Sequence, residues 1–577
     1  MIKKNNLMKL DWIALEDYDD VISVISFVER NDKKIKDYYL KKIKSTKEIE
    51  VLGQNFFEIF NWNHHFNFLK MSNLFEMSFY KNPEINESLK LIGLKFIIKK
   101  YNPKSVSISN SPNSVNSALN SLSINEKIHF EFKDELNISF SKGIKKIIPN
   151  YFTSVVWLLM YFFKNKAKGK NDWKKFENSI FLMGYFTHVN RNQLLKNQFK
   201  SGMWGSFFEY FSRDSYFNFL HHYIPNRTTE NIEVGQRQLN LINTEKSTHN
   251  FIDNFMSFNS IIKVLLIYTK TYLKTFLLLD SYSKRINQIF GFKIMSFYQN
   301  DVKSSLDGIN LIQNIFWCIH FDKIFSVIPF QKKGFYLMEN QGWEFAFIDA
   351  WKKHNHGKLY AIQHSTLAFW DLRYSYPFLN EKYSPDLYLV NSKNNLRTFL
   401  EYGYPKSKVF MIETLRYYYL NEIIINRNLN SVLIFGDIIY DLTTEMINTV
   451  NEILDDFKHL SFSFKAHPAL NLNFKDISPD IKIVKKDVRL LFPYYDTIIC
   501  PSSSGVAAEA YALGLKVIVF IKPGEINTSP LKKYEHVHFA SNSSDISNAL
   551  SIKDEINKHS SFLEFKTDKS KFLELIS

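Results

Sequence analysis

A histidine and three serines near the end of the chain are residue types that bind phosphate. His467 lies in FKAHP, and CPSSSG contains Ser502, Ser503, Ser504 and Gly505. Hydroxyl groups, a histidine ring N–H and the free backbone N–H groups at a helix start can all donate hydrogen bonds to phosphate oxygens. A His-Pro pair alone is often only a turn, and serines before a helix often only cap it. Together with the Glu509-Ala-x-x-x-Gly514 motif that follows, they predict a phosphate-binding site.

Two carboxylates earlier in the chain could act as a general base. Glu339 follows the apolar run GFYLM, and Glu344 lies five residues later in GWEFAF. A carboxylate at the edge of an active site can accept the proton of an attacking hydroxyl group. Glu344 has a simpler interpretation, because a glutamate in the first turn of a helix pairs with the helix dipole. We therefore predict that Glu339 is the catalytic base and that Glu344 is secondary.

Further polar residues follow in the segment QHSTLAFWDLRY. His364 ends an apolar run and is either a satisfied turn residue or a contact to the substrate. Asp371 and Arg373 either pair with each other or bind an anionic acceptor. The sequence leaves both alternatives open.

No pattern in the sequence favours a bound metal. Acidic groups at 17–20 (DYDD) and 455–456 resemble a metal-binding D-x-D, but a position near a terminus and one on a helix favour solvated charge. The chain has two cysteines, Cys318 and Cys500, which cannot form a cysteine zinc site. We expect no required metal and no other cofactor, with the phosphate held by His467, hydroxyls and a helix N-terminus.

The last 150 residues alternate between short apolar runs and helical segments. The apolar runs, each ending in polar or turn residues, are 431–437 (ending in Gly436 and Asp437), 460–468, 481–485, 496–505 and 516–524. Helical segments are expected at about 443–457 and at 506–514, where Gly514 is a good C-cap. Such alternation predicts a parallel, doubly wound sheet that binds ligands at the carboxyl ends of its strands. The predicted phosphate- and nucleotide-binding residues, which include Gly436 and Asp437, fall at or just after such ends.

A second region of the same kind precedes it. Strands are expected at 321–329, 334–340, 359–366 and 386–392, with an amphipathic helix at 343–357, and weaker strand candidates lie at 105–109 and 179–186. The predicted fold is α/β, with two Rossmann-like domains that face each other across a cleft. Residues 1–425 form the N-terminal domain, with helical insertions, and residues 426–577 form the C-terminal, nucleotide-binding domain.

One apolar segment suggests contact with a membrane. Residues 149–163 read PNYFTSVVWLLMYFF and precede the basic segment KNKAKGK. The run is shorter than the ~18–20 residues of a spanning helix. It is either a buried core helix or a helix lying in the membrane interface, with its lysines at anionic lipid.

The charge balance limits the possible partners. The chain has 73 Lys and Arg against 58 Asp and Glu, a formal net charge of +15. An excess of positive charge favours binding to nucleic acid, to an anionic membrane surface or to a phosphorylated substrate. The absence of a zinc finger, an RRM signature or a basic helix with heptads argues against nucleic acid. The N-terminus lacks the apolar core of a signal peptide and cysteines are few, so we expect a cytoplasmic protein, peripheral to the inner face of the cytoplasmic membrane if residues 149–163 touch lipid.

These features carry a resemblance to a known fold family. Two Rossmann-like domains, with a phosphate site in the second and a base in the first, resemble the GT-B glycosyltransferases. The His-Pro and Ser-Ser motifs resemble those of bacterial sialyltransferases, polysialyltransferases and Kdo transferases, which use CMP-activated sugars. The segment ENQGWE…QHST…FWDLRY also resembles bacterial surface-carbohydrate (O-antigen) biosynthesis proteins. The resemblance covers residues about 320–525 and implies that His467, Ser503 and Ser504 bind the donor phosphate, whereas Glu339 is assigned from its position.

The resemblance implies an inverting, metal-independent transfer of a nonulosonic acid or Kdo. The donor would be a CMP-sugar and the acceptor a surface glycan or glycolipid of O-antigen, capsule or lipopolysaccharide. Alternatives are a CDP-alcohol phosphotransferase of the teichoic-acid type, whose serine motif resembles D-Y-S-S, a sugar-nucleotide 2-epimerase, and a non-catalytic glycan-binding assembly protein.

Overall fold

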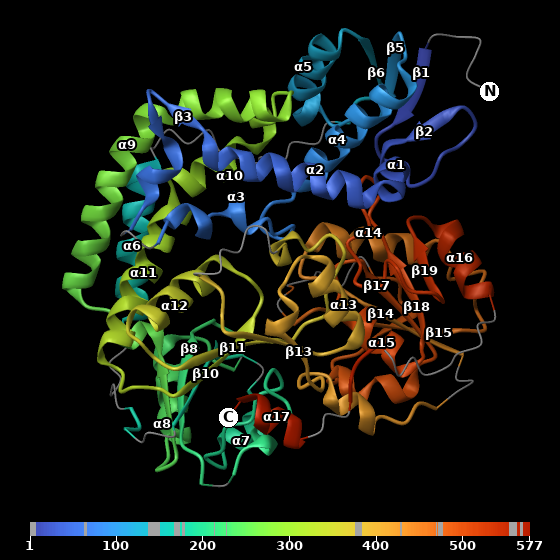
Figure 1. The fold of residues 1–577 in the computed structure, drawn as a ribbon. Helices are drawn as coiled ribbons and strands as arrows, with labels where there is room; N and C mark the ends of the chain where they lie inside the picture. Colours follow the sequence, from blue (N-terminus) through green and yellow to red (C-terminus); the bar gives the residue numbers. More distant parts are fainter. Residues whose placement is uncertain are drawn as a thin grey trace.

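Three parallel sheets with helices packed around them make up the molecule (Figure 1). The computed structural model describes residues 7–62, 66–136, 150–166, 173–175, 179–187, 189–212, 214–226, 228–375, 383–426, 430–468, 470, 477–552, 562–565 and 569–576. A small antiparallel ladder joins β3 (Glu50–Val51) to β4 (Gln54–Asn55).

The C-terminal sheet has the strand order β16-β15-β14-β17-β18-β19. Its strands are β14 (Ser431–Phe435), β15 (Ser461–Lys465), β16 (Ile481–Ile483), β17 (Thr497–Pro501), β18 (Lys516–Phe520) and β19 (Val537–Ala540). Its helices are α14 (Tyr440–Asn451), α15 (Val506–Leu513) and α16 (Ser543–Ser551). In chain order the strands run 3-2-1-4-5-6, the order of a Rossmann sheet. The chain order of the strands reverses between β14 and β17, and this position is the switch point of the sheet.

The apolar runs of this sheet are continuous because a hydrophobic core covers each of its two faces. In β14, Leu433 and Phe435 join the core on one face of the sheet, whereas Val432 and Ile434 join the core on the other. Successive side chains of a strand point to opposite faces, so a sheet covered on both sides requires apolar residues at every position.

The middle sheet has the same winding, with the order β13-β12-β11-β10-β7-β8-β9. Its strands are β7 (Ile180–Tyr185), β8 (Phe217–His222), β9 (Ser247–Phe251), β10 (Lys333–Met338), β11 (Lys358–Gln363), β12 (Leu387–Val390) and β13 (Val409–Met411). The helices of this region are α6 (Asn150–Asn165), α7 (Arg191–Leu194), α8 (Ile232–Ile242), α9 (Phe258–Phe290), α10 (Met295–Leu306), α11 (Ile309–Val327), α12 (Gly342–Lys353) and α13 (Lys393–Glu401). Its switch point lies between β7 and β10. The expected pair of Rossmann-like domains is therefore confirmed by the two strand orders.

A third sheet, which the sequence analysis did not predict, occupies the first part of the chain. Its order is β2-β1-β5-β6, formed by β1 (Leu7–Asp11), β2 (Val21–Ser23), β5 (Ser105–Ser109) and β6 (His129–Lys133). The helices of this region are α1 (Val24–Arg30), α2 (Asp32–Ser45), α3 (Asn73–Glu76), α4 (Glu84–Tyr101) and α5 (Asn116–Glu126). Charged residues interrupt the runs LMKLD and HFEFK, which weakens the strand pattern of β1 and β6.

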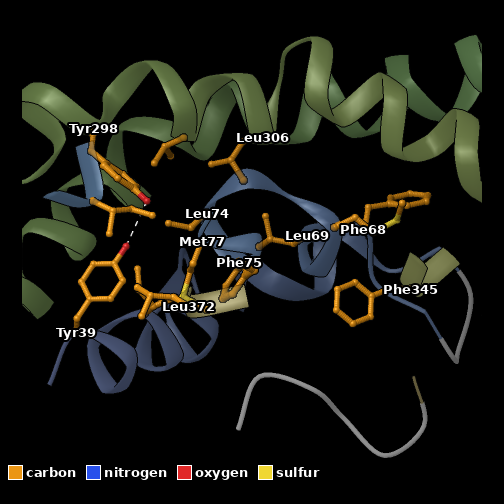
Figure 2. Close-up of a cluster of buried hydrophobic side chains, with 14 of the residues drawn as sticks. Tyr39, Phe68, Leu69, Leu74, Phe75, Met77, Tyr298, Leu306, Phe345 and Leu372 are labelled. Carbon is orange, nitrogen blue, oxygen red and sulfur yellow. Dashed lines mark hydrogen bonds between the residues drawn. The ribbon is translucent and has the colours of Figure 1, made fainter. Parts of the chain in front are cut away.

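One hydrophobic core joins this first region to the middle sheet. It extends from Met8 to Val409 and also includes Ile526. Figure 2 shows part of it, where the hydroxyl oxygens of Tyr39 of α2 and Tyr298 of α10 lie 3.4 Å apart. The first sheet and one face of the middle sheet therefore share one buried core.

Residues 321–329 were expected to be a strand, and this expectation is wrong. Most of the segment lies in α11, which ends at Val327 before Pro329. Most residues of α11 are buried, including Phe321, Ile324 and Phe325, because the helix lies between other elements of the core. A short apolar run in a fully buried helix has no distinguishing period, so the pattern could not separate helix from strand. The other predicted strands are present, with ends shifted by at most four residues.

The end of the chain returns to the middle sheet. The predicted boundary at residue 425 falls between β13 and β14, but the last helix, α17 (Lys569–Ile576), joins the core on one face of the middle sheet. The ring of Phe572 lies 4.3 Å from that of Tyr210, measured between ring centroids. None of the helices within the described residues combines the length and apolar character needed to cross a bilayer.

Candidate functional site

At the switch point of the C-terminal sheet, residues from two neighbouring strands touch. Asp437 follows β14 and Ser503 follows β17, and the Ser503 hydroxyl donates a hydrogen bond to the Asp437 carboxylate. The other Asp437 oxygen accepts from the N–H of Ile439 at 2.9 Å. A Cβ at Gly436 would lie 3.1 Å from both Thr443 and Phe464, so a side chain there would require these neighbours to shift. The first β-α turn is therefore tightly packed beneath the site.

The three serines have different surroundings. Ser502 is buried, and its hydroxyl lies 3.1 Å from that of Thr528. Ser504 is half-buried, and its backbone N–H donates to the carbonyl of Pro501 at 3.0 Å. Within the described residues, the backbone N–H groups of Ser503 and Gly505 have no hydrogen-bond acceptor. These two N–H groups at the start of α15 are the donors that an anion could use.

His467 lies beside this turn, on an exposed position after β15. Desolvation of its ring lowers the pKa of His467, as does Lys465, whereas the carboxylate of Asp437 raises it. β15 is the direct neighbour of β14, so the sheet itself brings His467 towards Asp437.

Glu509, assigned to the donor site from the sequence, lies in the first turn of α15 but is buried against another segment. Its carboxylate accepts a hydrogen bond from the Tyr419 hydroxyl at 2.7 Å. Burial raises the pKa of Glu509, while Tyr419, Arg416 and Arg489 act to lower it. The Glu509 carboxylate therefore interacts with Tyr419 and Arg416, which lie in the segment between the middle and C-terminal sheets.

The switch point of the middle sheet carries Glu339. Glu339 directly follows β10 at the switch point, and its side chain is 23% exposed. One carboxylate oxygen lies 3.3 Å from Nε2 of the buried His364. The other accepts from the Gln341 side chain and lies 3.9 Å from Nη1 of Arg373. Glu339 is thus held from both sides while its carboxylate remains accessible.

Glu344 is five residues away but in a different environment. It is buried in the first turn of α12, and its carboxylate accepts from three backbone N–H groups, those of Glu339, Asn340 and Gln341, at 2.9 to 3.1 Å. Burial raises the pKa of Glu344 to about 8, although these N–H groups act in the opposite direction. Its contacts are those of a residue that fixes the turn carrying Glu339.

Asp371 and Arg373 pair with each other. The Arg373 guanidinium donates two hydrogen bonds to the Asp371 carboxylate, at 2.9 Å and 2.7 Å. Burial lowers the pKa of Arg373, but Asp371 and Glu339 raise it more, so the net pKa lies well above the ordinary range. Of the two alternatives left open by the sequence, the structure shows the pair, and Arg373 reaches Glu339 from it.

Tyr80, absent from the sequence analysis, connects the two groups of residues. Its hydroxyl donates to the backbone carbonyl of Ser503 at 3.0 Å. Desolvation of this hydroxyl raises the pKa of Tyr80 to about 12, and the carboxylates of Asp371, Asp437 and Glu339 act in the same direction. Carboxylates of both sheets therefore act electrostatically on one hydroxyl group, which itself contacts the turn after β17.

Arg416, also missed, lies in the segment between the two sheets. Tyr417 is the main cause that raises the pKa of Arg416, and Glu509 and Glu339 add to it. The carboxylates of Glu509 and Glu339, one from each sheet region, therefore both act electrostatically on the Arg416 guanidinium. The sequence analysis assigned this segment to the end of the N-terminal domain, and no motif marks either Arg416 or Tyr80.

Two general features complete the description. In the part of the chain that the structure describes, no three His, Cys, Asp or Glu side chains are grouped so that they could hold a metal ion. Both cysteines are buried and free.

Comparisons with known proteins give similarity at the level of the fold. No protein-family model matches the sequence, and no curated protein is significantly similar to it. UDP-GlcNAc 2-epimerase from Methanocaldococcus jannaschii is a similar solved structure, with 12% identity and a TM-score of 0.39 over 69% of this chain and 99% of that one. Anabaena Alr3699/HepE in complex with UDP has 9% identity and a TM-score of 0.32, over 64% and 88%. MurG from Acinetobacter baumannii has 9% identity and a TM-score of 0.29, over 69% and 91%.

Proposed function

We propose that this protein is a nucleotide-sugar-dependent glycosyltransferase that is inverting, needs no metal ion and uses a CMP-sugar as donor. The observation that supports the proposal is the position of Tyr80. Its hydroxyl donates to the Ser503 carbonyl at the edge of the C-terminal sheet, and carboxylates at the ends of both sheets, Glu339 and Asp437 among them, raise its pKa. Ligands of doubly wound sheets bind at such switch points.

The donor phosphate would bind at the start of α15. The N–H groups of Ser503 and Gly505 would donate to it, together with the Ser504 hydroxyl and His467. Asp437 would not contact the phosphate, because two negative charges repel each other. Its role is to hold the Ser503 hydroxyl, and its charge opposes in part the desolvation that lowers the pKa of His467.

The transfer would be a single displacement. Glu339 accepts the proton of the acceptor hydroxyl as its oxygen forms a bond to the anomeric carbon. The bond from that carbon to the phosphate oxygen breaks on the opposite face, and CMP leaves with the electron pair. The site's donors stabilise the new charge on the phosphate. The proton remains on Glu339, and the configuration at the anomeric carbon is inverted.

His364 and Arg373 would position the base. They lie on opposite sides of the Glu339 carboxylate, at 3.3 Å and 3.9 Å, and limit its rotation. The acceptor is a glycan or glycolipid, and a nonulosonic acid or Kdo is the sugar that the motif resemblance favours.

Nucleotide release from CMP-, UDP- and GDP-sugars tests the donor class. We expect release from the CMP-sugar alone, with EDTA leaving the rate unchanged. CMP should also raise the melting temperature, because a ligand that binds only the folded state stabilises it. Release from UDP- or GDP-sugars but not from CMP-sugars would contradict the donor assignment, and loss of activity in EDTA would contradict metal independence.

A further inference from the structure

Helices α6 and α9 carry an exposed apolar surface on the outside of the molecule. Ten of their large apolar side chains are 40% to 78% exposed. They are Phe152, Val156, Met160 and Phe163 of α6 and Phe258, Ile262, Leu266, Leu273, Phe276 and Leu277 of α9. Among the described residues, thirty large apolar side chains are exposed in all, so one third lie on these two helices. A concentration of this kind marks an interaction surface.

The two helices lie side by side and antiparallel. Tyr151, near the start of α6, lies against Tyr272 of α9, with ring centroids 5.1 Å apart, and its hydroxyl is 2.9 Å from that of Thr269. Tyr161, near the end of α6, donates to Asp253, which precedes α9. Figure 1 shows α9 along the outer edge of the molecule, with α6 beside it.

Both helices pack onto the same buried helix, so their exposed sides share one direction. Tyr161 of α6 contacts Phe316 of α11, and Ser260 of α9 lies 3.2 Å from Nε2 of His320, also of α11. On α6 the exposed apolar residues follow each other at intervals of four, four and three, which places them on one side of a helix. The ten residues therefore form one face, which we name the α6–α9 face.

This finding bears on the two alternatives for residues 149–163, of which the structure describes 150–163. Leu158 and Phe162 are in the core, whereas Phe152, Val156, Met160 and Phe163 are exposed. One side of this helix thus packs in the core, and the opposite side lies on the surface. The sequence analysis did not include α9, which contributes six of the ten exposed apolar residues.

The charges beside the α6–α9 face are almost all positive. Lys263, Lys270 and Lys274 are exposed and follow each other at intervals of seven and four, so they form a line along one flank of the apolar side of α9. Lys164 is the one charged residue of α6. Along α9, Asp280 is the one acidic residue, against five basic ones. An apolar stripe beside a line of lysines is the arrangement of helices that lie in a lipid interface.

We propose that the α6–α9 face docks onto an anionic lipid surface. The apolar side chains enter the interface between headgroups and acyl chains, and the lysines contact the negative headgroups. A second copy of the chain fits less well, because two such faces brought together would place basic lines near each other on a protein that carries a net charge of +15. The inference is independent of the proposed catalytic function.

Flotation with vesicles provides the first test. Wild-type protein should bind vesicles of phosphatidylcholine mixed equally with phosphatidylglycerol, bind pure phosphatidylcholine weakly, and detach as salt concentration rises. The triple variant Met160→Glu, Leu266→Glu, Leu273→Glu should bind roughly tenfold or more weakly. The matched control is Ile424→Glu, Leu490→Glu, Ile552→Glu, which alters three exposed apolar residues elsewhere and should bind like the wild type.

A second variant isolates the charge. Lys263→Gln, Lys270→Gln, Lys274→Gln should lower binding to the anionic vesicles by roughly tenfold or more and reduce its salt dependence. Equal binding of this variant and the wild type, or equal binding to both vesicle types, would overturn the proposal. A wild-type dimer in light scattering that the Met160 triple variant converts to a monomer, without lipid binding, would assign the face to a second copy instead.

Fluorescence keeps the test valid if the acidic triple variant does not fold. Because Cys318 and Cys500 are both buried, a single introduced cysteine can be labelled with an environment-sensitive dye. The dye on Met160→Cys or Leu273→Cys should shift to shorter emission wavelength on anionic vesicles, and the dye on Ile424→Cys should not. An unchanged spectrum at both face positions would contradict the proposal.

Discussion

The carboxyl edges of the middle and C-terminal sheets differ in chemistry although their strands are wound in the same order. On the C-terminal edge, the available groups are backbone N–H groups, hydroxyls and one histidine, with Asp437 turned to Ser503. On the middle edge they are a carboxylate held by a buried histidine and an arginine. The comparison shows that the winding determines where a site lies, whereas the residues at the strand ends determine what it can do.

The two edges also differ in how strongly the proposed reaction depends on a single side chain. At the start of α15 several donors would share the proposed phosphate, so the loss of one would leave the others in place. At Glu339 a single carboxylate would take the proton. The effect of a substitution should therefore be larger on the middle edge, and the following changes measure this difference.

The largest effect is expected for Glu339→Gln. The amide keeps the size and the contacts of the side chain but cannot accept a proton, so turnover at saturating donor should fall by about 10²–10⁴-fold with donor binding nearly unchanged. Glu344→Gln is the matched control and should have a milder effect on turnover, since its carboxylate caps the turn. If Glu344→Gln is the inactive variant and Glu339→Gln remains active, the base has been assigned to the wrong residue.

His467→Ala should have the next largest effect. Removal of one donor to the leaving phosphate typically lowers turnover by about 10²–10³-fold. The control is His459→Ala, because His459 is also exposed but precedes β15 and so lies at the opposite edge of the sheet. Near-wild-type turnover of His467→Ala, measured by nucleotide release, would leave the His-Pro pair as a structural turn.

A smaller effect is expected for Ser504→Ala. A hydrogen bond to a charged group contributes about 1.5–3 kcal/mol, so the KM for the donor should rise by roughly tenfold or more. Ser502→Ala should change the KM less, because the Ser502 hydroxyl is buried against Thr528. Should Ser502→Ala raise the KM more than Ser504→Ala does, the phosphate would lie deeper in the turn than proposed.

The smallest effect on catalysis, but a distinct effect on stability, is expected for Glu344 as pH changes. Burial raises the pKa of Glu344 to about 8 in the folded protein, above its ordinary value of 4.5. The folded state thus binds the proton more tightly than the unfolded state, and this stabilisation is lost as pH rises from about 5 to about 8. The melting temperature of the wild type should fall relative to that of Glu344→Gln across this range. A difference that does not change with pH would show that Glu344 is ionised throughout.

The strand ends of the C-terminal sheet could be predicted because their signal is local. Runs such as SVLIF and KVIVF are apolar at every position, since each side chain enters one of two cores. Motifs at the ends of such runs must then lie at one edge of a parallel sheet. The half-polar strands β1 and β6 lack this signal, and most of 321–329 became a helix because a fully buried apolar run fits either structure.

By itself, then, the sequence determined the α/β winding of the C-terminal region and the placement of His467, the serines and Glu339 at strand ends. Only the tertiary structure decided which groups meet there. Tyr80 contacts Ser503 from 423 residues away, and no local pattern encodes such a contact. The structure likewise separated Glu339 from Glu344, because burial depends on what the rest of the chain packs against each carboxylate.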